Sequence, residues 1–466
     1  MKNIYGIAVG LLLIHTSCKE SVVEVAEVRP PNIVIIVADD LGWSDLGSYG
    51  NPYFESPHLD ALAKKGMRFT NAYSGSHVCS PTRASFLTGR SPARVGLTNY
   101  LFGTKKVEDS PVLPAEYVNH LPLKEITIAE ELKKDGYKTA LIGKWHLGEN
   151  TTFGMSDPKF QGFDVTEGFD YELLPVEDTY KWYKIGDTTN AFELPYLTDE
   201  ITQNSIKFIE QHKDTTFFMT VAHFAVHLPL QGKDSLVTKY QEKENPRPDD
   251  YHPTYAAMIE QMDASVGTIL QSLEDNDLMD NTLVVFVSDN GGLAVGEAGD
   301  KPTVNDPLRA GKGTMYEGGI RVPMMAYWKD HFDGGFLNHS TISTMDIFPT
   351  LLKLVRGNES VDQTIDGENK LAAFSSEKLL PRKSLYFHYP HFSNQGGRPK
   401  AAVRMGDMKL ILSLEDETTE LYNLKNDMGE KEDVSTKFPK ITSRMKDSIT
   451  RWLKDTNAPM PIKKMK

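Results

Sequence analysis

Residues 31–40 read Pro31-Asn32-Ile33-Val34-Ile35-Ile36-Val37-Ala38-Asp39-Asp40, and this stretch decides the fold. Its β-branched apolar run is continuous, which is typical of a parallel strand that is buried on both faces. Two carboxylates follow the run, and ligands gather at the carboxyl ends of strands in open α/β sheets. The stretch therefore predicts a central strand that carries Asp39 and Asp40 into a functional site.

Further strands and helices alternate along the chain after this stretch. Helices are expected over residues 56–66, 127–136, 197–211 and 255–273, and strands over 137–142, 216–222 and 282–287. Thr127 and Glu130 have the spacing of a capping box, and Gly136 is placed to end that helix. This alternation predicts an α/β fold in which helices sandwich a large, mostly parallel sheet.

The pattern changes after Leu352, and a second, smaller unit is expected at the C-terminus. Residues 357–371 are polar and irregular. Two short apolar runs flank Gly406-Asp407 and predict a hairpin over 401–414. An amphipathic helix over 438–453 follows. We therefore divide the chain into a large domain at 31–356 and an α+β subdomain at 357–466, with an antiparallel sheet and a helix.

The N-terminus has the features of an export signal. Lys2 precedes an apolar run over residues 4–14 that is too short to span a bilayer, and Cys18 follows a small residue. We expect a signal peptide at 1–17, a lipid anchor on Cys18 and a tether at 18–30. Simple secretion is the alternative, because His15 departs from a lipidation motif. The expected location is the periplasm or the outer membrane or cell surface of a Gram-negative bacterium.

Charge and cysteine content limit the partners of the chain. The net charge of −13 argues against nucleic acid as a partner and would repel a polyanionic substrate, so a site for one must be locally basic. We expect contact with a membrane only through the lipid anchor. Of the two cysteines, Cys79 has no partner for a disulfide if Cys18 is lipidated. A lone thiol in an oxidising compartment is a liability unless it is consumed chemically.

Cys79 begins the motif Cys79-Ser80-Pro81-Thr82-Arg83, which is continued by Phe86-Leu87-Thr88-Gly89. Pro81 fits the first turn of a helix, so Cys79 should lie just before a helix N-terminus, where an anion is favoured. Gly89 can end the helix in a left-handed conformation. By itself, Cys-x-Pro-x-Arg is more often a structural cysteine beside an ordinary helix start.

The longer motif resembles the signature of type I sulfatases, in the alkaline phosphatase superfamily. Other segments resemble blocks of the same family: Gly143-Lys144-Trp145-His146-Leu147-Gly148, Ala225-Val226-His227-Leu228-Pro229 and residues 309–323. The chain is most similar in pattern to exported bacterial polysaccharide sulfatases. The resemblance implies that a maturation enzyme oxidises Cys79 to formylglycine (3-oxoalanine). This aldehyde is then hydrated and attacks sulfur.

A metal site is predicted at the ends of two strands. Asp39 and Asp40 follow one strand, and Asp289 and Asn290 follow another. Carboxylate and amide oxygens suit Ca²⁺ or Mg²⁺ and are poor ligands for zinc. Either segment alone would more often be a turn, since turns favour Asp, Asn and Gly. The resemblance implies one Ca²⁺ ion, with Mg²⁺ the weaker choice, and implies that residue 79 contributes an oxygen to it.

The resemblance also assigns roles to basic residues. Arg83, Lys144 and Lys312 would supply positive charge to the sulfate. His227, with Lys312, would protonate the departing sugar oxygen, and His146 would accept a proton as sulfate leaves. A sugar pocket could include Tyr100, Arg309 and His388, although each is more often ordinary packing.

These observations predict an enzyme that hydrolyses sulfate esters on a sulfated carbohydrate. By analogy alone, the substrate is an algal polysaccharide such as ulvan or carrageenan. One alternative is a phosphomonoester, phosphodiester or phosphonate hydrolase of the same superfamily, which often has a second metal and a threonine or serine nucleophile. The other is a non-catalytic lipoprotein that only binds glycans, but none of Cys79, Arg83 and His146 is lost.

Overall fold

A computed structural model describes residues 29–464, except for 104, 149–155, 169–170, 177–178, 185–195, 298 and 300. The predicted signal peptide, Cys18 and nearly all of the tether lie outside the described residues. The helices of the described residues do not include one with both the length and the hydrophobicity of a membrane span.

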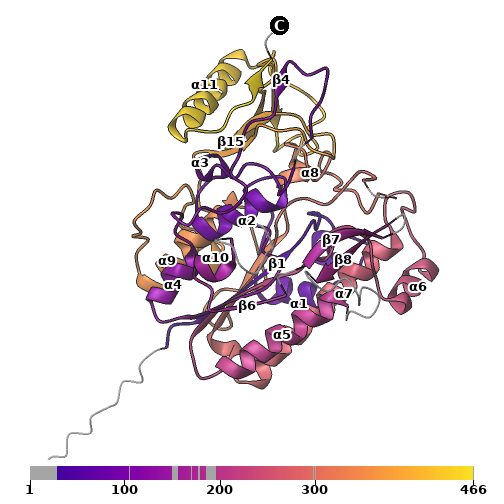
Figure 1. Ribbon diagram of the computed structural model, residues 1–466, viewed down its shortest axis with the longest axis vertical. Helices are drawn as coiled ribbons and strands as arrows, with labels where there is room; N and C mark the ends of the chain where they lie inside the picture. The colour runs from indigo at the N-terminus through magenta and orange to yellow at the C-terminus, as the bar shows by residue number, and fades with distance from the viewer. Residues whose placement is uncertain are drawn as a thin grey trace, which may run out of the picture.

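An eight-stranded sheet forms the centre of the large domain (Figure 1). In spatial order its strands are β12 (Phe336–Asn338), β2 (Met67–Phe69), β11 (Met324–Tyr327), β10 (Thr282–Ser288), β1 (Asn32–Ala38), β9 (Phe217–Ala222), β5 (Lys138–Gly143) and β6 (Val165–Glu167). Within this sheet β11 alone runs antiparallel to its neighbours, which confirms the mostly parallel arrangement.

Strand β1 is buried on both faces, as its continuous apolar run predicted. Ile33, Ile35 and Val37 join one hydrophobic core, and the alternate residues join the core on the opposite face. A fully buried Ile or Val side chain contributes about 1.5–3 kcal/mol to folding. The strand is therefore stabilised from both sides.

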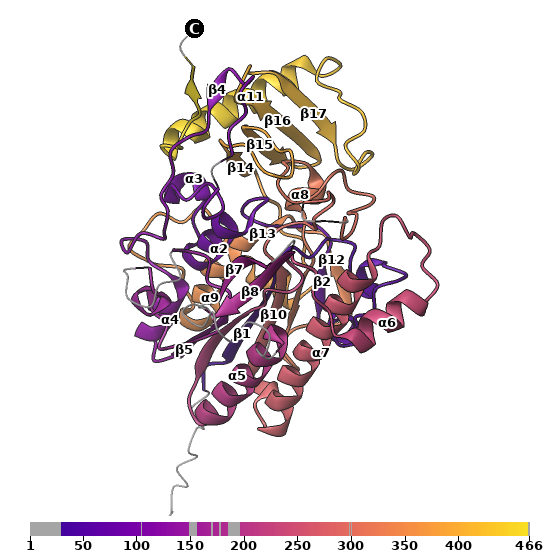
Figure 2. The same cartoon turned by 45° about the vertical axis from the view of Figure 1, so that its right-hand side comes forward.

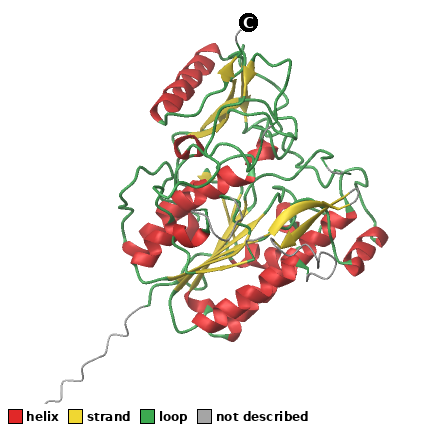
Figure 3. Ribbon diagram, in the orientation of Figure 1, coloured by secondary structure: helices red, strands yellow, loops and turns green. Residues whose placement is uncertain are grey.

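Helices cover both faces of the sheet (Figure 3). One core contains side chains of α2 (Cys79–Thr88), α4 (Ile128–Lys134), α9 (Ile347–Arg356) and α10 (Leu371–Ser375). The other contains side chains of α1 (Pro57–Lys65), α5 (Leu197–His212), α6 (Asp234–Glu242) and α7 (Pro253–Asp275). The capping box of Thr127 and Glu130 is present at the start of α4.

Short elements complete the described chain. The helical ones are α3 (Pro92–Val95), α8 (Glu317–Ile320) and four 3-10 turns at Gly47–Tyr49, Pro158–Gln161, Met279–Asn281 and Thr344–Asp346. Three two-stranded pairs join β3 (Ala72–Tyr73) to β13 (Ile342–Ser343), β4 (Val112–Leu113) to β18 (Ile462–Lys463), and β7 (Tyr171–Val176) to β8 (Thr179–Lys184).

The C-terminal unit is an antiparallel sheet with one helix, as expected (Figure 2). Its strands, in order, are β14 (Leu385–Tyr389), β15 (Lys400–Met405), β16 (Met408–Ser413) and β17 (Thr419–Asn423), and α11 (Pro439–Asp455) packs on one face. Side chains of the other face share a core with Tyr73, Val78, Met315 and Ile320 of the large domain. The C-terminal unit is thus anchored beside the start of α2.

Candidate active site

Adjacent parallel strands bring the predicted acidic residues together. In the β1–β10 register Ala38 is opposite Ser288, so Asp39 and Asp289 begin the two loops at the same level. The Asp40 amide donates to Asp289 Oδ1 at 3.2 Å, and Asn290 Nδ2 donates to Asp40 Oδ1 at 2.7 Å. Asp39, Asp40, Asp289 and Asn290 are all buried. The predicted convergence of these four side chains is therefore present.

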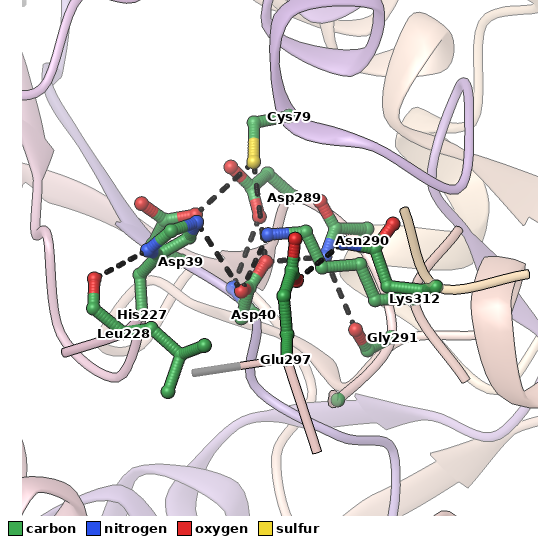
Figure 4. A network of polar contacts seen from close by, with 12 residues as sticks. Asp39, Asp40, Cys79, His227, Leu228, Asp289, Asn290, Gly291, Glu297 and Lys312 are labelled. Atoms are coloured by element: carbon green, nitrogen blue, oxygen red, sulfur yellow. Dashed lines mark hydrogen bonds and ion pairs between the residues drawn. The ribbon is translucent and has the colours of Figure 1, made fainter. Parts of the chain in front are cut away.

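The side chain of Cys79 points toward this acidic group (Figure 4). It is the first residue of α2, so the helix begins at the cysteine itself, and Val78 occupies the N-cap. Its Sγ lies 3.4 Å from Asp39 Oδ1 and 3.9 Å from Asp40 Oδ1. Burial, and then the charge of Asp39, raise the pKa of the Cys79 thiol well above its ordinary value. Since the thiolate is the reactive form, this sulfur is poorly suited to act as a nucleophile itself.

Three cations surround the carboxylates. Arg83 donates from Nε and Nη2 to Asp289 Oδ2 at 2.9 and 2.7 Å, and from Nη1 to the Lys144 carbonyl at 2.9 Å. Lys144 forms an ion pair with Asp39, and Lys312 lies 2.7 Å from Asp40 Oδ2. Burial alone would raise the pKa of Asp39, but the nearby cations, Lys144 foremost, hold it below its ordinary value. Three cations thus balance the charges of the three carboxylates, so the site carries no excess of negative charge although the protein as a whole is acidic.

His146 presents one ring nitrogen as a base. Its Nε2 lies 2.8 Å from the carbonyl oxygen of Leu101, so that nitrogen must carry the hydrogen. Its buried Nδ1 has no hydrogen-bond partner among the described residues. Burial, and then Lys144, lower the pKa of His146 well below its ordinary value. The imidazole is therefore neutral, with an accepting lone pair on Nδ1.

His227 is fixed in the opposite tautomer. Its Nδ1 lies 2.7 Å from the Leu228 carbonyl oxygen, and its Nε2 lies 3.6 Å from Asp40 Oδ2. Burial, and then Lys312, lower the pKa of His227, while Asp40 and Asp39 oppose that shift. An anion bound beside this ring would favour its protonated form.

The residues around Asp40 fit a cation. One oxygen each of Asp39 and Asp40, the sulfur of Cys79 and a nitrogen of His227 lie within 4.8 Å of one another. Asn290 Oδ1 is buried without a hydrogen-bond partner among the described residues. Hard oxygen donors of this kind suit Ca²⁺ or Mg²⁺. Asp289, a predicted ligand, is not one of these four residues, and its oxygens accept hydrogen bonds from Arg83 and the Asp40 amide instead. His227 is one of the four, although the sequence pointed only to a role as an acid.

A buried support beneath Asp40 was not anticipated from sequence. The Tyr255 hydroxyl donates to Asp45 Oδ2 at 2.7 Å and lies 3.2 Å from the Asp40 carbonyl oxygen, and Thr303 donates to Asp45 Oδ1 at 2.8 Å. Asp40 itself has a left-handed backbone, with φ of 63°. Tyr255 was expected only as part of a helix, because its apolar periodicity is all that the sequence displays.

The three predicted sugar-pocket residues lie in different surroundings. Tyr100 packs against the core that contains Val78, and the residue after it, Leu101, contacts Ser80 and the His146 ring. Arg309 stacks on Tyr316 and donates to the Tyr422 hydroxyl at 3.0 Å. His388 Nε2 lies 2.6 Å from the Pro459 carbonyl oxygen, inside the C-terminal unit. Only Tyr100 of the three therefore borders the site.

Comparison with known proteins identifies the family. The sulfatase family pattern matches residues 31–357, and the pattern "N-sulphoglucosamine sulphohydrolase, C-terminal" matches residues 310–455. Human N-acetylgalactosamine-6-sulfatase is 34% identical over 375 residues, which cover 77% of this chain and 68% of that protein. A sulfatase of Formosa agariphila is 29% identical over 535 residues, covering 98% and 94% of the two chains.

A solved structure extends the similarity to the whole fold. The crystal structure of Ps i-CgsB in complex with k-i-k-neocarrahexaose has a TM-score of 0.76 and 29% identity, covering 94% of this chain and 96% of that one. A phosphonate monoester hydrolase of Agrobacterium radiobacter, at 16% identity and a TM-score of 0.66, shares the fold alone. Sulfatases typically use a metal and formylglycine, and a candidate site for both is present at Asp39, Asp40, Cys79 and His227. The chain belongs to the sulfatase family and is a sulfuric ester hydrolase.

Proposed function

We propose that this enzyme removes sulfate esters from a sulfated polysaccharide or its oligosaccharides, of the carrageenan or ulvan type. Formylglycine at residue 79 would be the nucleophile and one Ca²⁺ ion the cofactor. The observation that carries the proposal is the position of Cys79 Sγ, within 4 Å of two buried carboxylates and at the start of a helix. The 29% identity to a protein crystallised with a carrageenan oligosaccharide supports the substrate class.

Residue 79 would act after modification. Conversion of the thiol to an aldehyde consumes water, releases H₂S and removes two electrons, so it requires an oxidant and a separate maturation enzyme. The hydrated aldehyde supplies a hydroxyl for attack on sulfur and a second hydroxyl whose proton is later lost. Asp39, Asp40 and Asn290 would hold the Ca²⁺ ion, which would lower the pKa of the attacking hydroxyl, and Asp289 is proposed as a further ligand.

The cations of the site would bind the sulfate. Arg83 is fixed by both Asp289 and the Lys144 carbonyl, so its guanidinium is oriented before substrate arrives. Lys144 and Lys312 each pair with one carboxylate of the proposed metal site. A divalent cation on those carboxylates would reduce their hold on the lysines, and the ammonium groups would then be available to sulfate oxygens.

The two histidines would move protons at different atoms. Nδ1 of His146 is an acceptor, so it would take the proton of the second hydroxyl as the sulfate leaves. Nε2 of His227 would donate to the leaving sugar oxygen, assisted by Lys312. The bound sulfate would raise the pKa of His227 and so charge it for this step.

A sulfate-release assay tests the proposed function. The purified protein, produced with a maturation enzyme, would be assayed on carrageenan and ulvan oligosaccharides, with product mapping by mass spectrometry. We expect the wild type to release sulfate and Cys79→Ala to release none. A chelator should abolish the activity of the wild type, and added Ca²⁺ should restore it. Lys329→Met changes an exposed side chain that pairs with exposed Asp280, and it serves as the control. Equal turnover by Cys79→Ala would contradict the assignment of residue 79 as the nucleophile. Hydrolysis of phosphate or phosphonate esters, without hydrolysis of sulfate esters, would favour a phosphate or phosphonate hydrolase.

Export is proposed on the N-terminal pattern alone. We propose that the chain is carried out of the cytoplasm and anchored through lipid on Cys18. Labelling of the native protein with a radioactive fatty acid, lost in Cys18→Ala, would support the anchor. Unlabelled protein released into the medium would indicate simple secretion.

A further inference from the structure

A further acidic side chain, Glu297, lies at the border of this site. Glu297 is exposed and follows the segment of Asn290 by a few residues. Its Oε2 accepts a hydrogen bond of 2.5 Å from Nε2 of Gln395, which lies in the loop after β14. Gln395 is buried, and its amide oxygen and backbone nitrogen both contact Ser393 Oγ, at 2.8 and 3.1 Å. The carboxylate is therefore held by an amide that is itself fixed.

This pair packs directly against residues 311–314, the loop that carries Lys312. Gly313 follows Lys312 and has a left-handed backbone with φ of +79°. A Cβ atom there would lie 2.4 Å from Gln395 Oε1 and 2.3 Å from Ser393 Oγ, so the loop packs tightly against Gln395. Burial, and then the charge of Glu297, raise the pKa of Tyr100. Figure 4 draws Glu297 together with Lys312 and Asp40.

A carboxylate in this position needs an explanation. The site is built to bind an anion, and the chain already carries a net charge of −13. A further negative charge at its border weakens the attraction for any anion. The same carboxylate accepts hydrogen bonds from sugar hydroxyls, but it repels a sulfate or carboxylate group of the substrate. Its effect is therefore to distinguish between sugars by the charge of the groups that lie next to the reacting sulfate.

We propose that Glu297, oriented by Gln395, is a specificity-determining residue. It selects a sugar that presents uncharged hydroxyls beside the reacting sulfate ester and rejects one with a second sulfate there. The proposal rests on the proposed function, because it assumes that the neighbouring cations bind a sulfate ester. It adds that the preferred sugar ring is monosulfated.

The test compares matched sugars on matched variants. Monosulfated hexoses and their disulfated counterparts, with the second sulfate on the adjacent carbon or the next one, are assayed at physiological salt. The measured quantity is the ratio of kcat/KM for the disulfated sugar to that for the monosulfated sugar. Glu297→Gln should raise this ratio about 10-fold, equivalent to about 1.4 kcal/mol. Glu417→Gln removes the same charge at a side chain that is 73% exposed in the C-terminal unit, and it should leave the ratio unchanged.

Two outcomes would overturn the proposal. The first is a ratio that Glu297→Gln leaves unchanged, which includes an equal rise of kcat/KM for both sugars, because the carboxylate would then affect at most the general attraction for anions. Binding of the same sugars to Cys79→Ala, measured by calorimetry, separates this failure from failure of the proposed function. Selective binding without turnover of any sugar by the wild type would contradict the proposed chemistry while supporting the role of Glu297. The second is an absence of both binding and turnover, which would contradict both.

Discussion

Lys312 and Asp40 form a buried ion pair, in which Nζ lies 2.7 Å from Oδ2. The carboxylate comes from the end of β1 and the ammonium from the loop before α8, so the pair joins two segments that are distant in sequence. The same carboxylate is a proposed cation ligand, and the same ammonium is a proposed sulfate ligand. Cation, lysine and sulfate are therefore linked through Asp40.

Replacement of Lys312 tests this linkage through stability. In Lys312→Met without divalent cation, Asp40 remains buried with its partner removed, and breaking a buried pair costs about 3–5 kcal/mol. Ca²⁺ should restore most of that loss by neutralising the carboxylate, so it should raise the melting temperature more in the variant than in the wild type.

Lys329→Met is the control for this measurement, because it removes an exposed lysine whose partner, Asp280, is also exposed. Its stability and its response to Ca²⁺ should match those of the wild type. An equal Ca²⁺ response in Lys312→Met and wild type would show that Asp40 is not a cation ligand.

Replacement of His146 tests the assignment of the base. The lone pair of Nδ1 is lost in His146→Ala, so sulfate transfer should occur once and release should stall. After one turnover and gel filtration, the protein should retain about one equivalent of sulfate. Because the pKa of His146 is lowered, the acidic limb of the wild-type kcat profile should lie below pH 6.5. Multiple turnover by the variant at the wild-type rate would contradict the assignment.

Acid should destabilise the fold through buried histidines. Burial lowers the pKa of His223 from 6.5 to about 4, and its ring nitrogens have no hydrogen-bond partner among the described residues. As pH falls, His223 is protonated in the unfolded chain before it is protonated in the folded protein. Its contribution to the unfolding free energy is therefore fully present above pH 6.5 and is lost between pH 6.5 and 4. At pH 4 the loss from this residue approaches about 3 kcal/mol.

Urea unfolding of His223→Leu should show the change. Proton uptake on unfolding near pH 5.5 should fall by about one relative to the wild type. His339→Gln, which changes an exposed histidine, is the control and should retain the wild-type slope. A wild-type slope in His223→Leu would contradict the expected titration. His77, His388 and His391 also have pKa values lowered by burial, to about 3, 4 and 3. The unfolding free energy of His223→Leu should therefore still fall with decreasing pH, but less steeply than that of the wild type.

A buried lysine couples the C-terminal sheet to the start of α8. Lys409 Nζ lies 3.0 Å from Glu317 Oε1 and 2.8 Å from Glu430 Oε1, and all three side chains are fully buried. Lys409→Met leaves two carboxylates together without their shared cation, and it should reduce the unfolding free energy by about 3–5 kcal/mol. Adding Glu430→Gln should recover part of the loss, as urea unfolding would measure. Equal stability of the single and double variants would contradict this coupling.

The central strands and their terminal carboxylates could be predicted because each depends on a local pattern. The continuous run of β1 and its Asp39-Asp40 end required only strand burial and the rule for ligands in α/β sheets. The hairpin at Gly406-Asp407 likewise followed from its turn residues. The fold class and the convergence of four polar residues were therefore accessible from sequence.

Contacts between loops could not be predicted in the same way. Nothing in the local sequence of Gln395 indicates that it reaches Glu297, or that Tyr255 supports Asp40. His388 was a candidate for the sugar pocket, yet it lies within β14 and its ring bonds to the Pro459 carbonyl oxygen. Such pairings depend on how the C-terminal sheet packs on the large domain, and buried ion pairs such as Lys409 with Glu317 leave no periodic signal.

Peptide mass analysis of residue 79 tests the central claim most directly. The protein would be prepared with and without a maturation enzyme, and the fraction of residue 79 in the aldehyde form would be compared with the specific rate of sulfate release. We expect the rate to be proportional to that fraction and to vanish in folded protein that retains the thiol. Full sulfate release by protein in which residue 79 is entirely unmodified cysteine would contradict the account.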